Sequence, residues 1–306
     1  MWHYVIPHFD TFLRELQLST DDRNDASTKA ERVARSLFAK YYPNQTFTHD
    51  CYLPVGSYGR GTATKPCTDL DLLFILPNEV FARINALLGN KQSQLLREMR
   101  ETLVWTFPRT DLRADRQVVV APFETYAVEI VPAFRLDDGT FLTANSNDGG
   151  SWRISAPFAE YNHLHAADIA SDGKAAHLTM MAKAWNRECN VGLKSTSIEV
   201  LASIFASQWI YRDKGLFWYD WMIRDFFAFL FPYLNGWTRI IGTNDLIQLG
   251  DEWRTKLESA YNRSLKACEY EHADYGLAAA YEWQKIFGNQ FKTTMHLIPA
   301  LAAAIR

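Results

Sequence analysis

The sequence predicts an α+β protein with two lobes: a first lobe built on a mixed sheet, and a helical second lobe, with a cleft between them. Short β-rich runs alternate with helical patterns before Trp152, whereas residues 157–287 carry mostly helical periodicity. At 306 residues the chain is also long enough for each lobe to have its own core. We therefore place the first lobe, including its N-terminal scaffold helices, at 1–155 and the helical lobe at 156–306.

The first lobe opens with two predicted helices, a short one at 8–18 and a long one at 25–42. Pro43 and Asn44 end the long helix. Its apolar residues recur on one face that is wide enough to lie against a sheet, so we expect a scaffold helix. The residues of this face are Ala30, Val33, Ala34, Leu37, Phe38 and Tyr41.

Four β-rich runs predict the strands of one sheet, at 53–55, 70–76, 117–121 and 126–131. Helices are expected between the second and third strands, at 78–89 and 91–105. A turn separates the last two strands, so we expect them to form an antiparallel pair. The helical lobe is predicted to contain helices near 157–170, 174–189, 196–213, 218–231, 251–268 and 272–287.

The motif that says most about chemistry lies at the start of the second strand. Side chains alternate between the faces of a strand, so Asp69 and Asp71 point the same way. Two carboxylates on one side repel each other unless a cation lies between them. Their oxygen ligands suit Mg²⁺ or Mn²⁺. Upstream, a turn at Gly56 and Ser57 offers backbone N–H groups and a hydroxyl to a metal-bound triphosphate. This combination predicts a nucleotidyltransferase; the alternative is a polar turn that caps a strand.

Phosphoryl transfer usually needs a third carboxylate, and Glu129 is the candidate. It is the only acid in the apolar run 126–134. A carboxylate inside a buried strand is costly unless it is paired or bound to metal. The alternative is a salt bridge from Glu129 to an arginine such as Arg113 or Arg116. Among the basic residues, Arg60 lies nearest the Gly-Ser turn and is our first choice for an additional phosphate contact.

Composition limits the possible partners. The formal net charge is −3, so there is no strongly basic field to hold a long nucleic acid. No window approaches the roughly 18 apolar residues of a membrane span, and the first residues lack the pattern of a secretory signal. We expect a cytoplasmic location by default.

Two further motifs complete a resemblance to a known family. The segment 181–186, which contains Lys183, resembles a Lys-x-Trp helix, and the segment 194–201, which contains Ser195, resembles a Ser-x-x-Leu-Glu helix start. Together with 56–62, 69–71 and 128–133, they are similar to the cGAS/DncV-like nucleotidyltransferases (CD-NTases). The resemblance covers about residues 30–210. Without it, the residues favour a solvated lysine on an amphipathic helix for Lys183 and an ordinary N-cap for Ser195.

The resemblance implies a polymerase-beta-like catalytic lobe that makes a cyclic di- or trinucleotide from ATP or other nucleoside triphosphates. The product would be a second messenger of anti-phage (CBASS) signalling that activates a separate effector. Two Mg²⁺ or Mn²⁺ ions would be held by Asp69, Asp71 and Glu129. The donor triphosphate would contact a second set of residues, Gly56, Ser57, Arg60, Lys183 and Ser195. The third acid is usually Asp in this family, whereas this chain has Glu.

Two other functions remain open at this point. One is a nucleotidyltransferase of the same superfamily that acts on RNA ends or on a small-molecule hydroxyl. The other is a catalytically silent module that binds nucleotide or a partner. The low net charge argues against a long RNA acceptor, and the presence of all three acids argues against a silent module.

Overall fold

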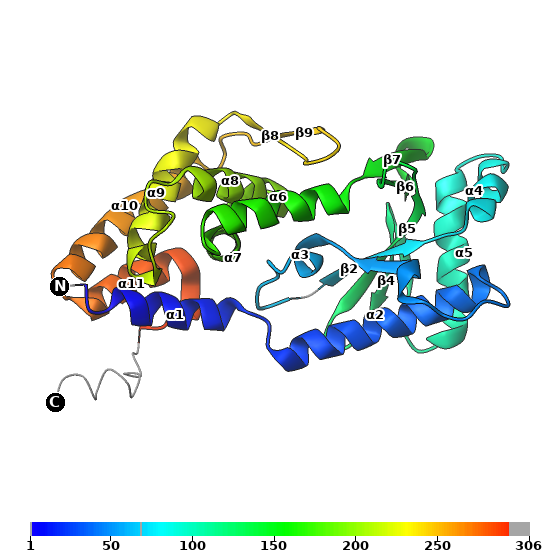
Figure 1. Cartoon of the computed structure of the whole chain (residues 1–306), viewed down its shortest axis with the longest axis horizontal. Helices are drawn as coiled ribbons and strands as arrows, with labels where there is room; N and C mark the ends of the chain where they lie inside the picture. Colours follow the sequence, from blue (N-terminus) through cyan, green and yellow to red (C-terminus); the bar gives the residue numbers. More distant parts are fainter. Residues whose placement is uncertain (1, 68, 294–306) are drawn as a thin grey trace. The chain divides into compact units, whose positions relative to one another are not determined.

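The computed structural model describes residues 2–67 and 69–293, which form two compact units. One unit is continuous, Leu18–Tyr161, and contains the sheet (Figure 1). The other combines the residues up to Gln17 with those from Asn162 onward. The observed units differ from the predicted division at 155/156 in two ways. The first helix belongs with the helical unit, and the sheet-containing unit ends at Tyr161, inside a helix.

The sheet of the Leu18–Tyr161 unit is mixed, as predicted. Its strands follow the order β1-β2-β5-β4-β3, and β6 pairs with both β5 and β7. The pairing of β2 with β5 is parallel, and the other pairings are antiparallel, including the predicted pair β4–β5. The strands are β1 (Tyr52–Pro54), β2 (Asp69–Ile75), β3 (Arg113–Asp115), β4 (Val118–Pro122), β5 (Ala127–Arg135), β6 (Phe141–Asn145) and β7 (Ser151–Ser155).

One face of this sheet is covered by the main core of the unit. Leu70, Leu72 and Phe74 of β2 point into it and pack with the apolar faces of two long helices, as expected for the scaffold helix. The opposite face carries Leu73 and Ile75, which belong to a smaller cluster. The helices of the unit are α2 (Thr20–Tyr41), α3 (Gly56–Gly59), α4 (Asn78–Asn85) and α5 (Lys91–Thr106), with 3₁₀ turns η1 (His49–Cys51) and η2 (Asn147–Gly149).

A capping box explains where the scaffold helix begins. The Ser19 hydroxyl accepts a hydrogen bond from the Asp22 N–H at 3.1 Å, and the Asp22 carboxylate accepts one from the Ser19 N–H at 2.8 Å. These bonds satisfy backbone groups that would otherwise lack partners at a helix start. The helix therefore begins at Thr20, five residues before its predicted start at 25.

Within the described residues, the second unit is helical apart from one two-stranded hairpin, β8 (Trp237–Arg239) with β9 (Leu246–Gln248). None of the helices in the described residues is long and apolar enough to cross a membrane. The helices are α1 (Val5–Leu16), α6 (Pro157–Ala170), α7 (Lys174–Glu188), α8 (Ser195–Gln208), α9 (Tyr219–Leu230), α10 (Arg254–His272) and α11 (Gly276–Phe287), with 3₁₀ turns η3 (Leu216–Trp218), η4 (Phe231–Tyr233) and η5 (Gly288–Gln290). The first residues of α6 still belong to the sheet-containing unit.

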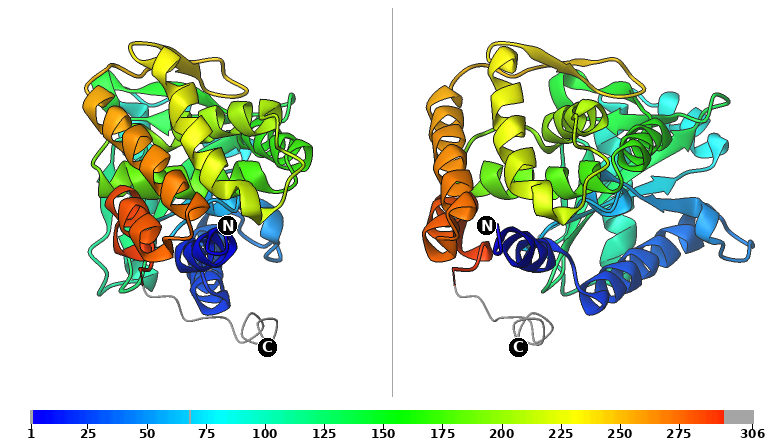
Figure 2. Two further views of the ribbon diagram at one scale, coloured as in Figure 1. Left: turned by 90° about the vertical axis from the view of Figure 1, so that its left-hand side faces the viewer. Right: turned by 60° about the vertical axis from the view of Figure 1, so that its left-hand side comes forward.

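Aromatic packing explains why the first helix joins this unit. Phe9 and Phe12 of α1 are fully buried. The Phe12 ring lies 4.7 Å from that of Phe287 (between centroids), and the Phe9 ring 5.3 Å from that of Trp283, both in α11. The ribbon views show α1, in dark blue, next to the C-terminal helices, in orange to red (Figure 2). Buried aromatic side chains dominate the energetics of a core. The contacts that place α1 are therefore made with residues more than 260 positions away in the chain.

A buried group of titratable side chains lies within the same core. The His8 Nδ1 is 2.6 Å from the Glu271 Oε1, and both side chains are almost inaccessible. Nearby, the Asp220 carboxyl accepts a hydrogen bond from the Trp221 N–H at 2.8 Å. Burial, with a smaller contribution from Glu271, raises the pKa of Asp220 to about 7. Folding therefore favours the protonated form of Asp220.

This raised pKa predicts a pH-dependent effect of Asp220→Asn. Between the unfolded pKa of 3.8 and the folded pKa of about 7, only the unfolded state loses the proton, so wild-type stability falls as pH rises. The neutral asparagine lacks this dependence. We expect the variant to gain about 2–3 kcal/mol on the wild type between pH 5 and 7, at roughly 1.4 kcal/mol per pH unit. Urea unfolding at several pH values measures the difference; a difference that does not change with pH contradicts the prediction.

Candidate functional site

The parallel pairing of β2 with β5 brings the three predicted acids to one face of the sheet. Asp71 lies directly opposite Glu129, and Asp69 opposite Ala127. Partner residues on paired strands project to the same face, and so do residues two apart on one strand. The alternate residues, such as Leu70 and Val128, point into the main core on the other face. Asp69, Asp71 and Glu129 therefore share the face that the scaffold helices leave uncovered.

The electrostatic surroundings of Glu129 are acidic. Its pKa is raised first by burial and then by the charges of Asp71, Asp69 and Asp115. Arg113 instead pairs with Asp111 at 2.9 Å, and Arg116 lies 3.8 Å from Asp115. Within residues 2–67 and 69–293, Glu129 forms no ion pair with a basic side chain, so the alternative of a salt bridge to these arginines is not met. Gathered carboxylates of this kind are stabilised by a cation.

The Gly-Ser segment lies directly against this group. Gly56 begins the one-turn helix α3 with a φ of +61°, a left-handed value that favours glycine. A Cβ on Gly56 would lie 1.8 Å from the Asp71 Oδ2, so only a hydrogen atom fits there. The Val55 N–H also donates to the Asp71 carbonyl at 2.9 Å. The backbone that leads into Ser57 is thus held beside one of the acids.

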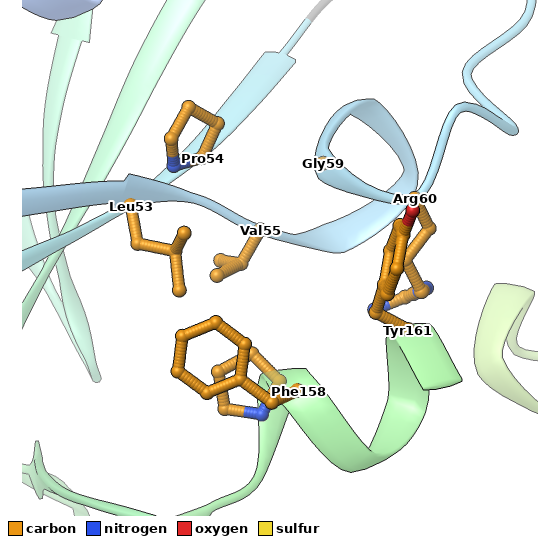
Figure 3. A pocket seen from close by; sticks show the side chains of 8 residues that line it. Leu53, Pro54, Val55, Gly59, Arg60, Phe158 and Tyr161 are labelled. Carbon is orange, nitrogen blue, oxygen red and sulfur yellow. The ribbon is translucent and has the colours of Figure 1, made fainter. Parts of the chain in front are cut away.

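Arg60 immediately follows α3, and its guanidinium forms a buried ion pair with Glu160 of α6; the Arg60 side chain is 7% exposed. It lines a mainly apolar pocket of about 250 Å³ together with Leu53 and Val55 (Figure 3). Leu53 and Val55 point to the same side of the chain, towards Phe158. To contact phosphate as we predicted, Arg60 would have to exchange its pairing with Glu160.

The two predicted phosphate contacts in the helical unit have different surroundings. Lys183, in α7, is buried rather than solvated, with its Nζ 3.9 Å from the Glu199 Oε2. Ser195 is exposed and is the first residue of α8. The N-cap is Lys194, whose side chain makes no capping hydrogen bond, so Ser195 is not an N-cap.

The donor set fits a hard divalent cation, although the side chains do not enclose a metal site. Across the described ranges, no group of three or more His, Cys, Asp or Glu side chains is arranged to hold a metal ion. The in-register pair Asp71–Glu129 and the neighbouring Asp69 nevertheless supply only oxygen ligands, which Mg²⁺ and Mn²⁺ prefer.

Sequence reasoning did not identify two partners of the predicted residues. Glu199 pairs with Lys183, and Glu160 pairs with Arg60. Glu199 stands in the segment 194–201 that resembles a family motif, so a signal for it was present in the sequence. No pattern in the sequence pointed to Glu160, because it comes 100 residues after Arg60 and only the fold brings the two together.

A mixed sheet that carries three acids on one face, beside a Gly-Ser helix, defines a nucleotidyltransferase. The comparison with family models identifies the kind. Residues 4–167 match the Second Messenger Oligonucleotide or Dinucleotide Synthetase (SMODS) domain, and the chain belongs to this family. The predicted membership of the cGAS/DncV-like nucleotidyltransferases is thereby confirmed. No curated protein is similar enough to count as a match.

Solved structures show the same fold at low sequence identity. The chain is similar to Escherichia coli MS115-1 CdnC in its complex with HORMA-deltaN, at 17% identity and a TM-score of 0.64, covering 95% of this chain and 98% of that one. It is also similar to Vibrio cholerae DncV cyclic AMP-GMP synthase in complex with the linear intermediate 5′ pppA(3′,5′)pG, at 13% identity and a TM-score of 0.70, covering 92% and 94%.

The close contact of Gly56 with Asp71 predicts the outcome of Gly56→Ala. The added methyl group must displace the Asp71 carboxylate, so we expect a loss of at least about 100-fold in nucleotidyl transfer. Gly139→Ala is the matched control, because Gly139 has a φ of +83° but open space around its Cβ position. In both variants the alanine must adopt a left-handed backbone conformation, which costs about 1–2 kcal/mol. Only Gly56→Ala adds a clash with the Asp71 carboxylate. Steady-state rates and unfolding free energies measure the two effects; equal rates in the two variants contradict the assignment.

Proposed function

We propose that this chain is a metal-dependent synthase that makes a cyclic di- or trinucleotide second messenger from nucleoside triphosphates in anti-phage (CBASS) signalling. Its family, second messenger oligonucleotide or dinucleotide synthetases, supports the type of product. The observation that carries the proposal is the register of Asp71 with Glu129, with Gly56 against Asp71. The enzyme would work in the cytoplasm and activate a separate effector through its product.

The three acids are proposed as the metal ligands. Without a cation, their proximity is unfavourable, since burial and then the charges of Asp71 and Asp69 raise the pKa of Glu129. Two bound Mg²⁺ or Mn²⁺ ions would remove this repulsion, neutralise phosphate charge and make a ribose hydroxyl more acidic. Glu129 has one methylene more than the usual aspartate, and its rotatable side chain can accommodate this difference.

The remaining residues are proposed to hold the donor triphosphate. Backbone N–H groups at Gly56 and the hydroxyl of Ser57 suit phosphate oxygens, and Lys183 supplies a point charge for them. Arg60 and Ser195 are further contacts. In the reaction, a ribose hydroxyl attacks the α-phosphorus of a second nucleotide, the bond to the bridging oxygen breaks and pyrophosphate leaves. The same step between the free ends closes the ring.

Nucleoside triphosphates are the proposed substrates. The structures of relatives include E. coli MS115-1 CdnC with ATP, which matches this chain at 17% identity and a TM-score of 0.62, over 95% of this chain and 98% of that one. At this identity the likeness shows the fold, so ATP as a substrate of this chain is part of the proposal.

Incubation with labelled nucleoside triphosphates and Mg²⁺ or Mn²⁺, followed by phosphatase, tests the proposal. A phosphatase-resistant product that disappears when the metal is chelated supports ring closure. Labelled RNA, or a labelled small molecule formed from added acceptors, supports a different transferase. An absence of turnover with either metal supports a silent nucleotide-binding module.

Substitutions of the acids test the metal assignment. Asp69→Asn combined with Asp71→Asn removes two charged ligands, so we expect product to disappear while the fold persists. Glu129→Gln should lower the rate by at least about 100-fold, because metal ligands supply several kcal/mol of transition-state stabilisation. Circular dichroism and the product assay measure fold and activity.

The shorter acid provides the matching control. Glu129→Asp keeps the charge and restores the aspartate usual in the family, so we expect it to retain far more activity than Glu129→Gln. Turnover that survives in the double asparagine variant, or a normal rate for Glu129→Gln, rules out the corresponding ligand assignment.

A further inference from the structure

Lys183 is buried in the helical unit, where its charge needs compensation. Its side chain is 9% exposed, and its neighbours in α7, Met181, Ala182 and Trp185, are buried apolar residues. A lysine in such surroundings tends to lose its proton unless an acid stabilises the charged form. An acid close to Lys183 is Glu199 of α8, whose side chain is 7% exposed.

Glu199 compensates the charge of Lys183 without forming a hydrogen bond to it. The Lys183 Nζ and the Glu199 Oε2 are 3.9 Å apart, beyond hydrogen-bond distance. The interaction between these two side chains is therefore electrostatic. A buried ion pair is often no more stabilising than well-packed apolar residues. Stability alone thus gives little reason for placing these two charges inside the helical unit.

Glu199 also acts on a third side chain. His163 of α6 is half-buried, and its pKa is lowered by burial, with Glu199 acting in the opposite direction. Its Nε2 is buried without a hydrogen-bond partner in the part of the chain that the structure describes. Glu199 is therefore a negative charge that influences basic groups on two other helices, α7 and α6.

We infer that Glu199 is a positioning residue for nucleoside triphosphate binding: it keeps the Lys183 ammonium charged and in place for the phosphates. This inference rests on the proposed function, in which Lys183 contacts the donor triphosphate. Glu199 itself carries the wrong charge to bind phosphate and acts through Lys183. Its removal therefore weakens binding of the triphosphate more than it slows the chemical step.

Glu199→Gln tests the inference, because glutamine keeps the size of the side chain and removes its charge. We expect KM for nucleoside triphosphates to rise at least about tenfold while kcat changes about twofold or less, the pattern of lost ground-state binding. Binding of the non-reacting α,β-methylene analogues of the four nucleoside triphosphates, in the presence of Mg²⁺, should weaken by the same factor. Glu199→Asp, which restores the charge, should recover most of this loss.

The matched control is Glu271→Gln, since Glu271 is also buried in this unit and pairs with His8. We expect this variant to lose thermal stability with no change in KM. A double-mutant cycle then shows whether Glu199 acts through Lys183: in a Lys183→Met background, Glu199→Gln should change KM by about twofold or less.

Three outcomes would overturn the inference. The first is an unchanged KM in Glu199→Gln, the second is a full effect of Glu199→Gln in the Lys183→Met background, and the third is the same KM change in Glu271→Gln. If the wild type binds the analogues but makes no product, the proposed synthase fails while the binding measurements still decide the role of Glu199. If the wild type binds none of the analogues, both proposals are wrong.

Discussion

The in-register parallel pairing of β2 with β5 is the constraint on which the rest of the structure depends. It sets Asp71 opposite Glu129 and, in alternation, Leu70 opposite Val128 and Leu72 opposite Ile130. A shift of one residue would move every side chain of a strand to the other face. The apolar side chains would then leave the core, and the carboxylates would enter it. The burial of the apolar face therefore fixes the position of the acids, so that the core and the site are determined by one set of hydrogen bonds.

The contact of Gly56 with Asp71 extends this constraint to the phosphate-binding segment. Val55 is bonded to the Asp71 carbonyl, which continues the pairing of β1 with β2 by one residue. The chain then turns at Gly56 into α3, with the glycine Cα against the carboxylate. Gly59 is as closely packed, since a Cβ there would lie 2.3 Å from the Pro54 carbonyl oxygen. Two glycines thus allow α3 to lie close to the sheet.

Local patterns predicted the fold class, the long helices and the acids. The helices had a clear apolar periodicity, and the second strand a continuous apolar run, which explains why their predicted limits lie close to the observed ones. The strands β3, β6 and β7 of the sheet were missed, as was the β8–β9 hairpin of the helical unit. β3 is exposed at all three positions, and β7 has no buried residue, so neither shows an alternating pattern. β6 is a short run with buried residues on both faces.

The other differences come from contacts that no local pattern encodes. β5 extends to Arg135, beyond the predicted end at 131 and through Pro132. On one side, the neighbour of β5 changes at Pro132 from β4 to β6. The proline, which has no N–H to donate, therefore falls between the hydrogen bonds to β4 and those to β6. The docking of α1 onto α11, and the pairs Lys183–Glu199 and Arg60–Glu160, join residues that are distant in sequence. The alternation of side chains along a strand predicted that Asp69 and Asp71 share one face of the sheet. Only the register of β2 with β5 shows that Asp71 lies opposite Glu129.

Two buried basic groups of the helical unit have acids beside them, whereas the charges around Glu129 on the sheet are alike, and this contrast supports the functional proposals. In the helical unit, Lys183 is close to Glu199 and His8 is close to Glu271, so each of these two basic groups has an acid as its neighbour. On the sheet, the charges that act on Glu129 are all negative. A protein that can place an opposite charge beside a buried group in one unit has the means to do so in the other. A bound divalent cation would relieve the repulsion among these like charges, which agrees with the proposal of phosphoryl transfer at this face.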